Sequence, residues 1–349
     1  MWQVIGQTRA VSLLQHSLEA GTLAHAYLLV GPPHVGKMTL ALNLAQALNC
    51  EADEKPCLEC PTCQKIALSN HADVQIIGLT QNEDAAEAKL IGIDQIKQMQ
   101  HSASLPPFEG NHKVFIIDGA ELLSTEAANC LLKTLEEPAD KVIFLLLTVN
   151  DSLLPATVVS RCQRLELPPL STSEVASALA GKGIEPGRAR LLAWLAHGCP
   201  GWAFLAADDD SLLQQHDEEL NKLLAVITAD CEERFAYVAQ LAAKFSQNRG
   251  LVYGTLDLWL DYWRDLMLVK TGCPDIITNI DRTDELVEMA RGYRLAQIKA
   301  FIESLQAVKE QLRQNANPRL VLEVLMLDIP RKEGGSEENL ATRFAVKHG

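Results

Sequence analysis

The stretch from Ala26 to Thr39 constrains the fold more than any other part of this 349-residue chain. Its first five residues, Ala-Tyr-Leu-Leu-Val, are apolar or aromatic and predict a short buried strand. The next seven, from Gly31 to Lys37, have the spacing G-x-x-x-x-G-K, and the Ala- and Leu-rich segment after them predicts a helix. In such a unit, backbone N–H groups wrap a phosphate chain and the lysine reaches the β/γ-phosphates. The stretch therefore predicts a phosphate-binding loop with Gly31, Gly36 and Lys37 as binding residues.

The loop lacks one residue that magnesium chemistry needs. The motif continues with Ser or Thr, whose hydroxyl is a ligand of Mg²⁺, and this position is Met38, which carries no oxygen. Thr39 follows one residue later, about a hundred degrees further round the helix. Thr39 stays a candidate nucleotide-site residue. Two alternatives remain for the loop: it binds ATP without hydrolysis, or it binds no ATP.

A carboxylate at the end of a second buried strand supports a nucleotide site. The segment 113–118 is apolar until it ends in Asp118, and nucleotide hydrolases of this kind hold Mg²⁺ through such a carboxylate. The alternative is that Asp118 binds no metal ion and only satisfies hydrogen-bonding groups at the end of the strand. A hydrolase would place a glutamate next, to polarise the attacking water, but this chain has Gly119 there and Glu121 two positions later. The sequence therefore predicts very slow hydrolysis.

The order of the segments predicts a parallel sheet with helices on both faces. Five short apolar runs alternate with segments of helical periodicity, and strands that are apolar throughout are typical of buried parallel sheets. The polar stretch 81–90 between two of them is expected to be a surface loop. The predicted strands are residues 26–30, 74–79, 113–118, 142–148 and 164–167.

Pro168 and Pro169 end this alternation. Ser171 and Glu174 then have the spacing of a capping box that opens a new helix, and the acidic run 208–210 is the expected linker to a long helical region. The predicted domains are residues 1–167, an α/β domain with a cysteine module at 50–63; 168–207, a small helical domain; 208–330, an all-α domain; and 331–349, a disordered tail.

Four of the nine cysteines are closely spaced. Cys50, Cys57, Cys60 and Cys63 follow the pattern C-x6-C-x2-C-x2-C. Four thiolates can close a tetrahedral site with no open position, which suits structural zinc; an iron–sulfur cluster and redox-active thiols are the alternatives. His71 is a candidate substitute ligand, although a lone histidine there is more often at the surface. The other five cysteines are scattered along the chain, which favours a reducing compartment over a disulfide framework.

Charge and hydropathy exclude several classes of function. The formal net charge of -14 argues against a stand-alone nucleic-acid binder, whose affinity would come from neutralising phosphates. It allows a nucleic-acid role inside a larger assembly. No apolar run approaches the ~20 residues that span a bilayer, and the first residues lack the layout of a signal peptide. A cytoplasmic protein without a membrane role is expected.

Arg161, between Ser160 and Cys162 at the start of the last strand, is a candidate catalytic residue. The functional interpretation is an arginine finger, offered in trans to a nucleotide held by a neighbouring subunit. The alternative is a surface arginine that pairs with a nearby carboxylate. Spacing alone does not decide between the two.

Taken together, these motifs resemble those of bacterial clamp-loader subunits. The four-cysteine module lies between the first helix and the next strand, as it does in that family, and the resemblance covers residues 1 to about 330. The other matching segments, in order, are Gly31–Lys37, Val114–Asp118, Asn129–Pro138, Ser160–Cys162 and Asn315–Leu320.

The resemblance implies an AAA+ ATPase fold, a small helical lid and a C-terminal helical collar domain. In the family, a ring of five subunits, gamma/tau and delta among them, opens a sliding clamp and sets it on primed DNA. The resemblance further implies that the four clustered cysteines bind zinc. It also implies that Arg161 completes the ATP site of an adjacent gamma/tau subunit, and that Thr148 occupies the position of the sensor residue. DNA would be met through backbone phosphates, without base readout.

Three departures from the family pattern favour a subunit that does not hydrolyse ATP. Met38 replaces the metal-binding hydroxyl, Gly119 replaces the water-activating glutamate, and Gly201 stands where active relatives carry a phosphate-sensing arginine. One rival is a gamma/tau-like ATP-hydrolysing subunit or another AAA+ motor, which would need Thr39 as metal ligand and Glu121 at the water. The other rival is a zinc-dependent structural adaptor with no role in any ATP site.

The last predicted domain carries apolar residues that are candidates for a subunit interface. Trp259, Trp263, Leu266 and Leu268 lie at helical spacing and would bury apolar surface against neighbouring subunits. The alternative is that they form the core of their own domain, which is the commoner role of apolar residues at this spacing.

Overall fold

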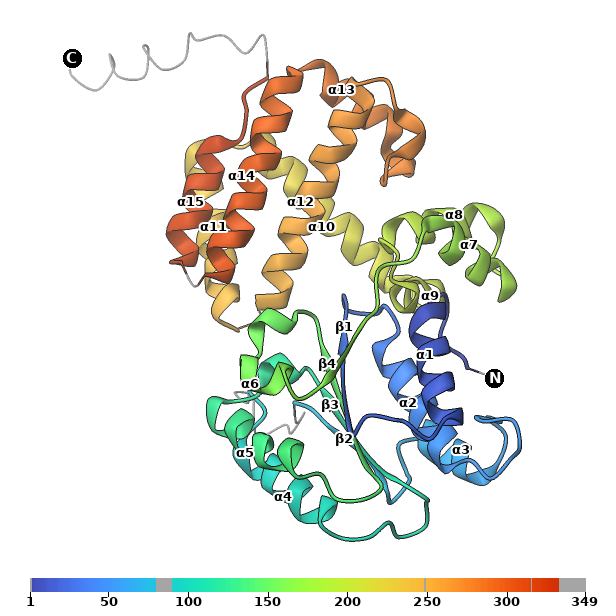
Figure 1. The fold of residues 1–349 in the computed structure, drawn as a ribbon. Helices are drawn as coiled ribbons and strands as arrows, with labels where there is room; N and C mark the ends of the chain where they lie inside the picture. Colours follow the sequence, from blue (N-terminus) through green and yellow to red (C-terminus); the bar gives the residue numbers. More distant parts are fainter. Residues whose placement is uncertain (1, 80–89, 248, 315, 333–349) are drawn as a thin grey trace, which may run out of the picture. The chain divides into compact units, whose positions relative to one another are not determined.

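Five parallel strands form the sheet that the sequence predicts, in the order β2-β3-β4-β1-β5 (Figure 1). The structure, a computed structural model, describes residues 2–79, 90–247, 249–314 and 316–332. Val30 lies beside Thr148, and Asp118 lies beside Leu147. The ends of β1, β3 and β4 therefore meet at one edge of the sheet. The strands are β1 (Ala26–Val30), β2 (Val74–Ile77), β3 (Lys113–Asp118), β4 (Val142–Thr148) and β5 (Gln163–Glu166).

Helices cover both faces of the sheet, and the alternation of side chains along β1 shows how. Tyr27 and Leu29 point into the core beneath one group of helices, while Ala26, Leu28 and Val30 point into the core on the other face. All five are buried, as expected for a central strand of a parallel sheet. The first group is α1 (Thr8–Glu19), α2 (Lys37–Asn49) and α3 (Pro61–Ala67); the second is α4 (Ile93–Ala103), α5 (Thr125–Glu136) and α6 (Ala156–Val159) (Figure 1).

Three short helices follow the sheet, and the predicted capping box opens the first of them. The Glu174 N–H donates to the Ser171 hydroxyl at 3.2 Å, and the Ser171 N–H donates to the Glu174 carboxylate at 2.9 Å. The Gln7 side chain donates to the Pro168 carbonyl at 2.8 Å, which ties the start of this segment to the N-terminus. The helices are α7 (Thr172–Gly181), α8 (Pro186–Leu195) and α9 (Pro200–Asp208).

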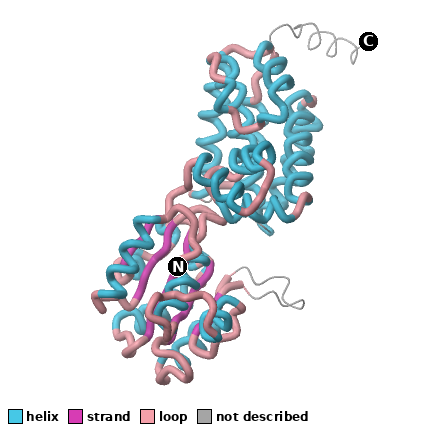
Figure 2. The backbone as a smooth tube through the Cα atoms, turned by 90° about the vertical axis from the view of Figure 1, so that its right-hand side faces the viewer, coloured by secondary structure: helices cyan, strands magenta, loops and turns pink. Residues whose placement is uncertain are grey.

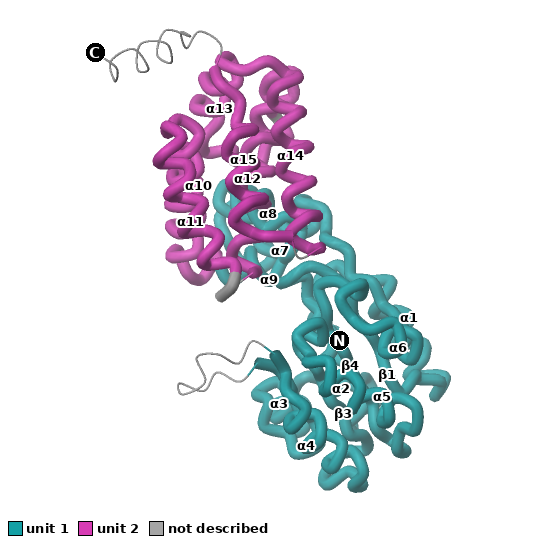
Figure 3. Tube along the Cα trace, turned by 90° about the vertical axis from the view of Figure 1, so that its left-hand side faces the viewer, with its two compact units in different colours: residues 1–205 teal, residues 206–349 magenta. Residues whose placement is uncertain are grey.

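The chain divides into two compact units, residues 1–205 and 206–349 (Figure 3). All five strands belong to the first unit, and the described elements of the second are helices (Figure 2). In the second unit α12 packs against α11, α13 and α14, and α15 packs against α11 and α14. Its helices are α10 (Ser211–Thr228), α11 (Cys231–Gln247), α12 (Arg249–Lys270), α13 (Thr283–Arg291), α14 (Leu295–Arg313) and α15 (Pro318–Asp328), with short 3-10 turns at Pro274–Ile276 and Ile280–Arg282.

The tryptophans of α12 do not form a subunit interface, so that prediction was wrong for them. Trp259 and Trp263 are 1% and 0% exposed and lie in the core of the second unit. Both rings approach Phe301, with centroids at 6.3 and 4.7 Å. Leu266 is also fully buried, and Leu268 packs partly buried against the same core. These residues stabilise their own unit, as apolar side chains at helical spacing usually do.

Two predicted segments lie wholly or mostly outside the residues that the structure describes. The expected surface loop 81–90 lies outside the described residues except for Leu90, and so does the expected disordered tail from residue 333 onward. The acidic run is partly helical: Asp208 is the last residue of α9, and α10 begins at Ser211. Two residues, Asp209 and Asp210, therefore separate the two helices.

A buried carboxylate shapes the loop that precedes β3. Asp73, 2% exposed, accepts backbone N–H bonds from Phe108, Glu109 and Gly110 at 2.7 to 2.8 Å. Burial alone would raise its pKa, but the three N–H donors outweigh burial and the pKa is lowered. The carboxylate form therefore stabilises the fold. Its contribution is present above the ordinary carboxyl pKa of about 4 and is lost as the pH falls through the lower folded value.

We predict that Asp73→Asn lowers the free energy of unfolding at neutral pH by about 3 kcal/mol, because bonds to a charged acceptor are lost and an amide N–H faces N–H donors. The difference from the unmodified chain should shrink below about pH 4. Urea unfolding across the acid range measures both effects. The exposed Asp140→Asn is the matched control. A difference that does not change with pH would contradict this account.

Candidate nucleotide and metal sites

The phosphate-binding loop begins where β1 ends, in a place with no room for a side chain. A Cβ on Gly31 would lie 2.4 Å from the Leu167 carbonyl oxygen, and the Gly31 N–H donates to the Thr148 carbonyl at 3.1 Å. Gly36 has φ +108°, a conformation that L side chains rarely adopt, and it is the N-cap of α2. The two glycines therefore set the course of the loop, as the motif predicts.

Lys37 lies at the centre of the site and folds back over the loop. Its Nζ donates to the Gly31 carbonyl at 2.5 Å and to the Pro32 carbonyl at 2.8 Å. Burial lowers the pKa of Lys37, and the carboxylates of Glu121 and Asp118 act in the opposite direction. One ammonium group thus faces two carboxylates in the same site.

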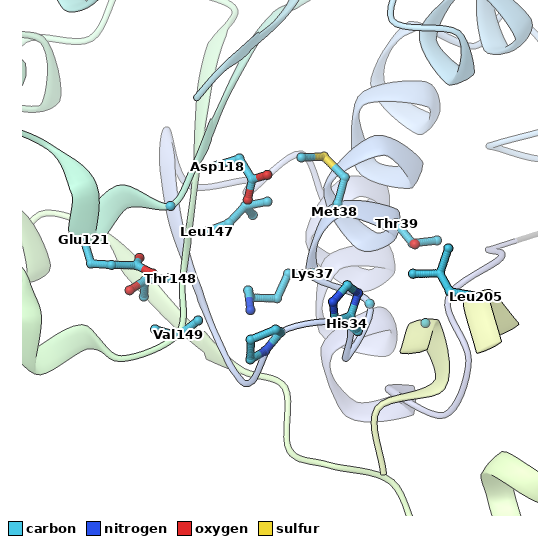
Figure 4. Close-up of a pocket in the computed structure, with 14 residues that line it drawn as sticks. His34, Lys37, Met38, Thr39, Asp118, Glu121, Leu147, Thr148, Val149 and Leu205 are labelled. Carbon is cyan, nitrogen blue, oxygen red and sulfur yellow. The ribbon is translucent and has the colours of Figure 1, made fainter. Parts of the chain in front are cut away.

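A cavity of about 490 Å³ lies over the loop, and it brings together most of the predicted nucleotide-site residues (Figure 4). Thr39 and Thr148 line it, as do Gly36, Lys37 and Asp118. The buried Thr148 hydroxyl bonds to the backbone of Asn150 at 3.0 Å, which holds it at the end of β4. Gly31 shapes the loop without lining the cavity.

The two residues after the lysine point to different sides of this cavity. Figure 4 shows the Met38 side chain directed to the side on which Asp118 lies, and Thr39 directed to the side of Leu205. The rotation expected between neighbouring helical residues accounts for this divergence. The Thr39 hydroxyl, which would replace the Ser or Thr hydroxyl of the motif, is therefore turned away from Asp118. Asp118 is the carboxylate that would share a metal ion with it.

Glu121 lies in the cavity, which sequence spacing did not predict. Gly119 has φ +77°, and a short 3-10 turn, Ala120–Leu122, follows it and brings Glu121 back toward Lys37. Its Oε2 is buried and has no hydrogen-bond partner among the described residues. The signal for this turn was Gly119 itself, since glycine after a strand commonly permits a left-handed turn.

The first turn of α9 contacts the phosphate-binding loop at His34, the middle residue of that loop. The Gly201 N–H donates to the His34 carbonyl at 2.9 Å, and a Cβ on Gly201 would come within 2.8 Å of that oxygen. His34 has φ +60°, which His tolerates better than most residues. Position 201 thus contributes backbone to the site, and an arginine there would need the helix and loop to move apart.

Arg161 lies between α6 and β5 and does not line the cavity. Its side chain is 33% exposed; the guanidinium pairs with Glu136 at the end of α5 and donates to the Thr157 carbonyl at 2.8 Å. The surface pairing that the sequence left open is therefore present. The guanidinium is nonetheless accessible to solvent.

The four clustered cysteines come together around one point. Their sulfur atoms all lie within 4.8 Å of one another, and those of Cys57 and Cys63 are 3.9 Å apart. In a tetrahedral site with metal–sulfur bonds of about 2.3 Å, sulfurs are about 3.8 Å apart. The N–H groups of Cys60 and Cys63 each donate to the sulfur three residues before, at 3.4 Å. The cluster could hold a metal ion.

The loop around the cluster favours a thiolate at Cys57 and excludes His71. Backbone N–H groups of Cys60 and Glu59 lower the pKa of Cys57 to about 6, whereas burial raises the pKa of Cys63. His71 lies outside the cluster. It is buried rather than at the surface, contrary to expectation, and its Nδ1 accepts the Asp73 N–H at 3.1 Å.

Comparisons with known proteins agree with this architecture. Two family models match, "DNA polymerase III, delta subunit" over residues 6–171 and "DNA polymerase III, delta subunit, C terminal" over residues 214–331. DNA polymerase III subunit delta' of Bacillus subtilis is 28% identical, with 92% of this chain and 95% of the relative covered. The tau subunit of the same organism is also 28% identical, with 93% and 60% covered.

Among solved structures, the Thermotoga maritima RuvB branch-migration motor is 19% identical over 91% of this chain and 87% of that one, with a TM-score of 0.43. That score is too low to carry an argument. No described helix has both the length and the apolar character that crossing a membrane requires.

The order of the strands and the G-x-x-x-x-G-K loop between β1 and α2 define an α/β domain of the P-loop type. The matched models and relatives then specify the group more narrowly. The chain belongs to the delta'/gamma/tau family of DNA polymerase III clamp-loader subunits.

We predict that Cys60→Ser abolishes stoichiometric metal binding and lowers the free energy of unfolding by more than the ~1 kcal/mol typical of a point mutation. Elemental analysis of the purified chain and urea unfolding measure the two effects. The exposed Cys273→Ser is the matched control. A metal-free chain of full stability, or equal losses in the control, would contradict a structural metal.

Proposed function

We propose that this chain is a clamp-loader subunit that does not hydrolyse ATP at its own site and supplies Arg161 to the ATP site of a neighbouring subunit. The observation that carries the proposal is the position of Arg161, solvent-accessible and away from the chain's own cavity. A guanidinium that completes a site in trans must be presented at a surface in this way.

The contacts of Arg161 are compatible with such a transfer. Glu136, its partner, is itself half-exposed, and an ion pair between exposed groups contributes only about 0–1 kcal/mol. The Thr157 carbonyl orients the guanidinium without neutralising it. A γ-phosphate offered by a neighbour could therefore replace the carboxylate at small cost, and the bidentate geometry of arginine suits it.

The chain's own cavity lacks groups for hydrolysis. Met38 offers no oxygen to a metal ion, Gly119 carries no base, and Gly201 packs its backbone on the loop where active relatives carry an arginine. Each departure removes a different part of the machinery of phosphoryl transfer. Their coincidence at one site supports a subunit that serves the site of another.

The remaining parts of the proposal come from the family. The partners would be gamma/tau and delta subunits in a five-subunit ring, the sliding clamp, and primer-template DNA contacted through backbone phosphates. A replication role would place the chain in the cytoplasm. The ion held by Cys50, Cys57, Cys60 and Cys63 would be Zn²⁺ with a structural role, because four thiolates leave no open position. Sulfurs this close leave no space for the several atoms of an iron–sulfur cluster.

One observation favours a second candidate, an ATP-hydrolysing subunit. Glu121 lies in the cavity and faces Lys37, so a carboxylate is present where a water could be activated. Thr39 lines the cavity as well. Its direction away from Asp118 (Figure 4) counts against this candidate, because the metal ion would lose one of its two protein ligands.

We predict that Arg161→Ala slows hydrolysis at the site that receives this residue by about 10³-fold or more. In a reconstituted complex with gamma/tau and delta, the loss should appear as that site's share of the DNA- and clamp-stimulated ATPase rate. Arg164→Ala is the matched control, since Arg164 is also exposed and paired with carboxylates.

The isolated chain provides the other arm of the assay. It should show no turnover above background with or without Lys37→Ala. Brisk turnover that Lys37→Ala abolishes would favour the ATP-hydrolysing candidate. An unchanged rate of the complex with Arg161→Ala would favour a structural adaptor.

A further inference from the structure

We propose that the cavity over the phosphate-binding loop binds a nucleoside diphosphate without a divalent cation, and that Met38 is the residue that excludes the cation. This inference rests on the proposed function, since it concerns the nucleotide site which that function leaves without hydrolysis. It specifies the ligand of the site and the residue that selects it.

The half of the cavity that receives phosphate is complete. Gly31 and Gly36 give the loop its course, and α2 begins directly behind it, so the positive end of the helix dipole faces the cavity. Among the residues that the structure describes, the Lys37 ammonium donates to two carbonyls, both in the loop itself. An incoming phosphate can replace these bonds with charge-assisted ones.

The half that would receive a cation is not complete. Mg²⁺ requires near-octahedral oxygen ligands at about 2.0–2.1 Å, and a thioether is a soft ligand that suits it poorly. Met38 directs its thioether to the side of Asp118, and the Thr39 hydroxyl lies on the other side (Figure 4). The residues present therefore do not fit Mg²⁺.

The charges of the cavity then select the diphosphate. Glu121 and Asp118 both act on the Lys37 ammonium, where the β- and γ-phosphates of a nucleotide would lie. Without a cation, a γ-phosphate would add negative charge beside two carboxylates, which is unfavourable. The first turn of α9, Pro200-Gly-Trp-Ala, brings no basic side chain to offset it. A diphosphate needs only the loop and Lys37.

Isothermal titration of the full chain with ADP and ATP, in EDTA and in excess Mg²⁺, tests the inference. ADP should bind in EDTA, about tenfold more tightly than ATP does, and should bind no more tightly in excess Mg²⁺, because the cation withdraws free ADP as its Mg²⁺ complex. Lys37→Ala should abolish binding. Met38→Thr should make ADP binding about tenfold tighter in Mg²⁺ than in EDTA, and with Mn²⁺ as probe it should show a bound-metal EPR signal that the unmodified chain lacks.

Met267→Thr, a matched change in the second unit, should behave like the unmodified chain. Three results would overturn the inference: a requirement of the unmodified chain for Mg²⁺, no binding of ADP in either condition, or a folded Met38→Thr chain that gains no dependence on Mg²⁺. Thermal unfolding of each variant establishes folding. None of these results bears on Arg161, whose assay in the assembled complex depends on the neighbour's nucleotide, so the two proposals fail separately.

Discussion

The close approach of β1 and β5 at their carboxyl ends is the constraint on which the nucleotide site depends. The Leu167 N–H donates to the Val30 carbonyl at 2.8 Å, and the Leu167 carbonyl then lies against the next residue of the loop, Gly31. Any side chain at that position would separate the strands. The course of the loop, the start of α2 and the direction of Lys37 all follow from this contact. The shape of the site is therefore set by the backbone of a buried sheet.

The backbone and the side chains of the site have separate roles. The glycines, the strand ends and the N-terminus of α2 form a phosphate cradle and also hold the fold together. On the proposed function, Met38, Gly119 and Gly201 stand at the positions of metal binding, water activation and phosphate sensing. A side chain at Gly31 would disturb the sheet, and one at Gly119 or Gly201 would also meet neighbouring atoms, at 2.9 and 2.8 Å. On the proposed function, such a subunit would keep the domain that carries Arg161 without hydrolysing ATP at its own site.

The sequence was sufficient to predict the parallel sheet and the meeting of Asp118 and Thr148 with the loop, because apolar strands and glycine spacing are local signals. It was not sufficient for three features. Glu121 enters the cavity through a 3-10 turn whose direction depends on the φ of Gly119. His71 is buried because Asp73 organises a loop distant in sequence. The tryptophans of α12 show the general difficulty: periodicity identifies a buried face and does not tell which surface covers it.

The internal burial of Trp259 and Trp263 changes where assembly surfaces are to be sought. The second unit already buries its large aromatic side chains in a core of its own. Its contacts with other subunits must then use side chains that remain exposed on the outer faces of its helices, and those contacts can be of moderate strength. The ion pair of Arg161 joins two partly exposed side chains, and such pairs contribute only about 0–1 kcal/mol.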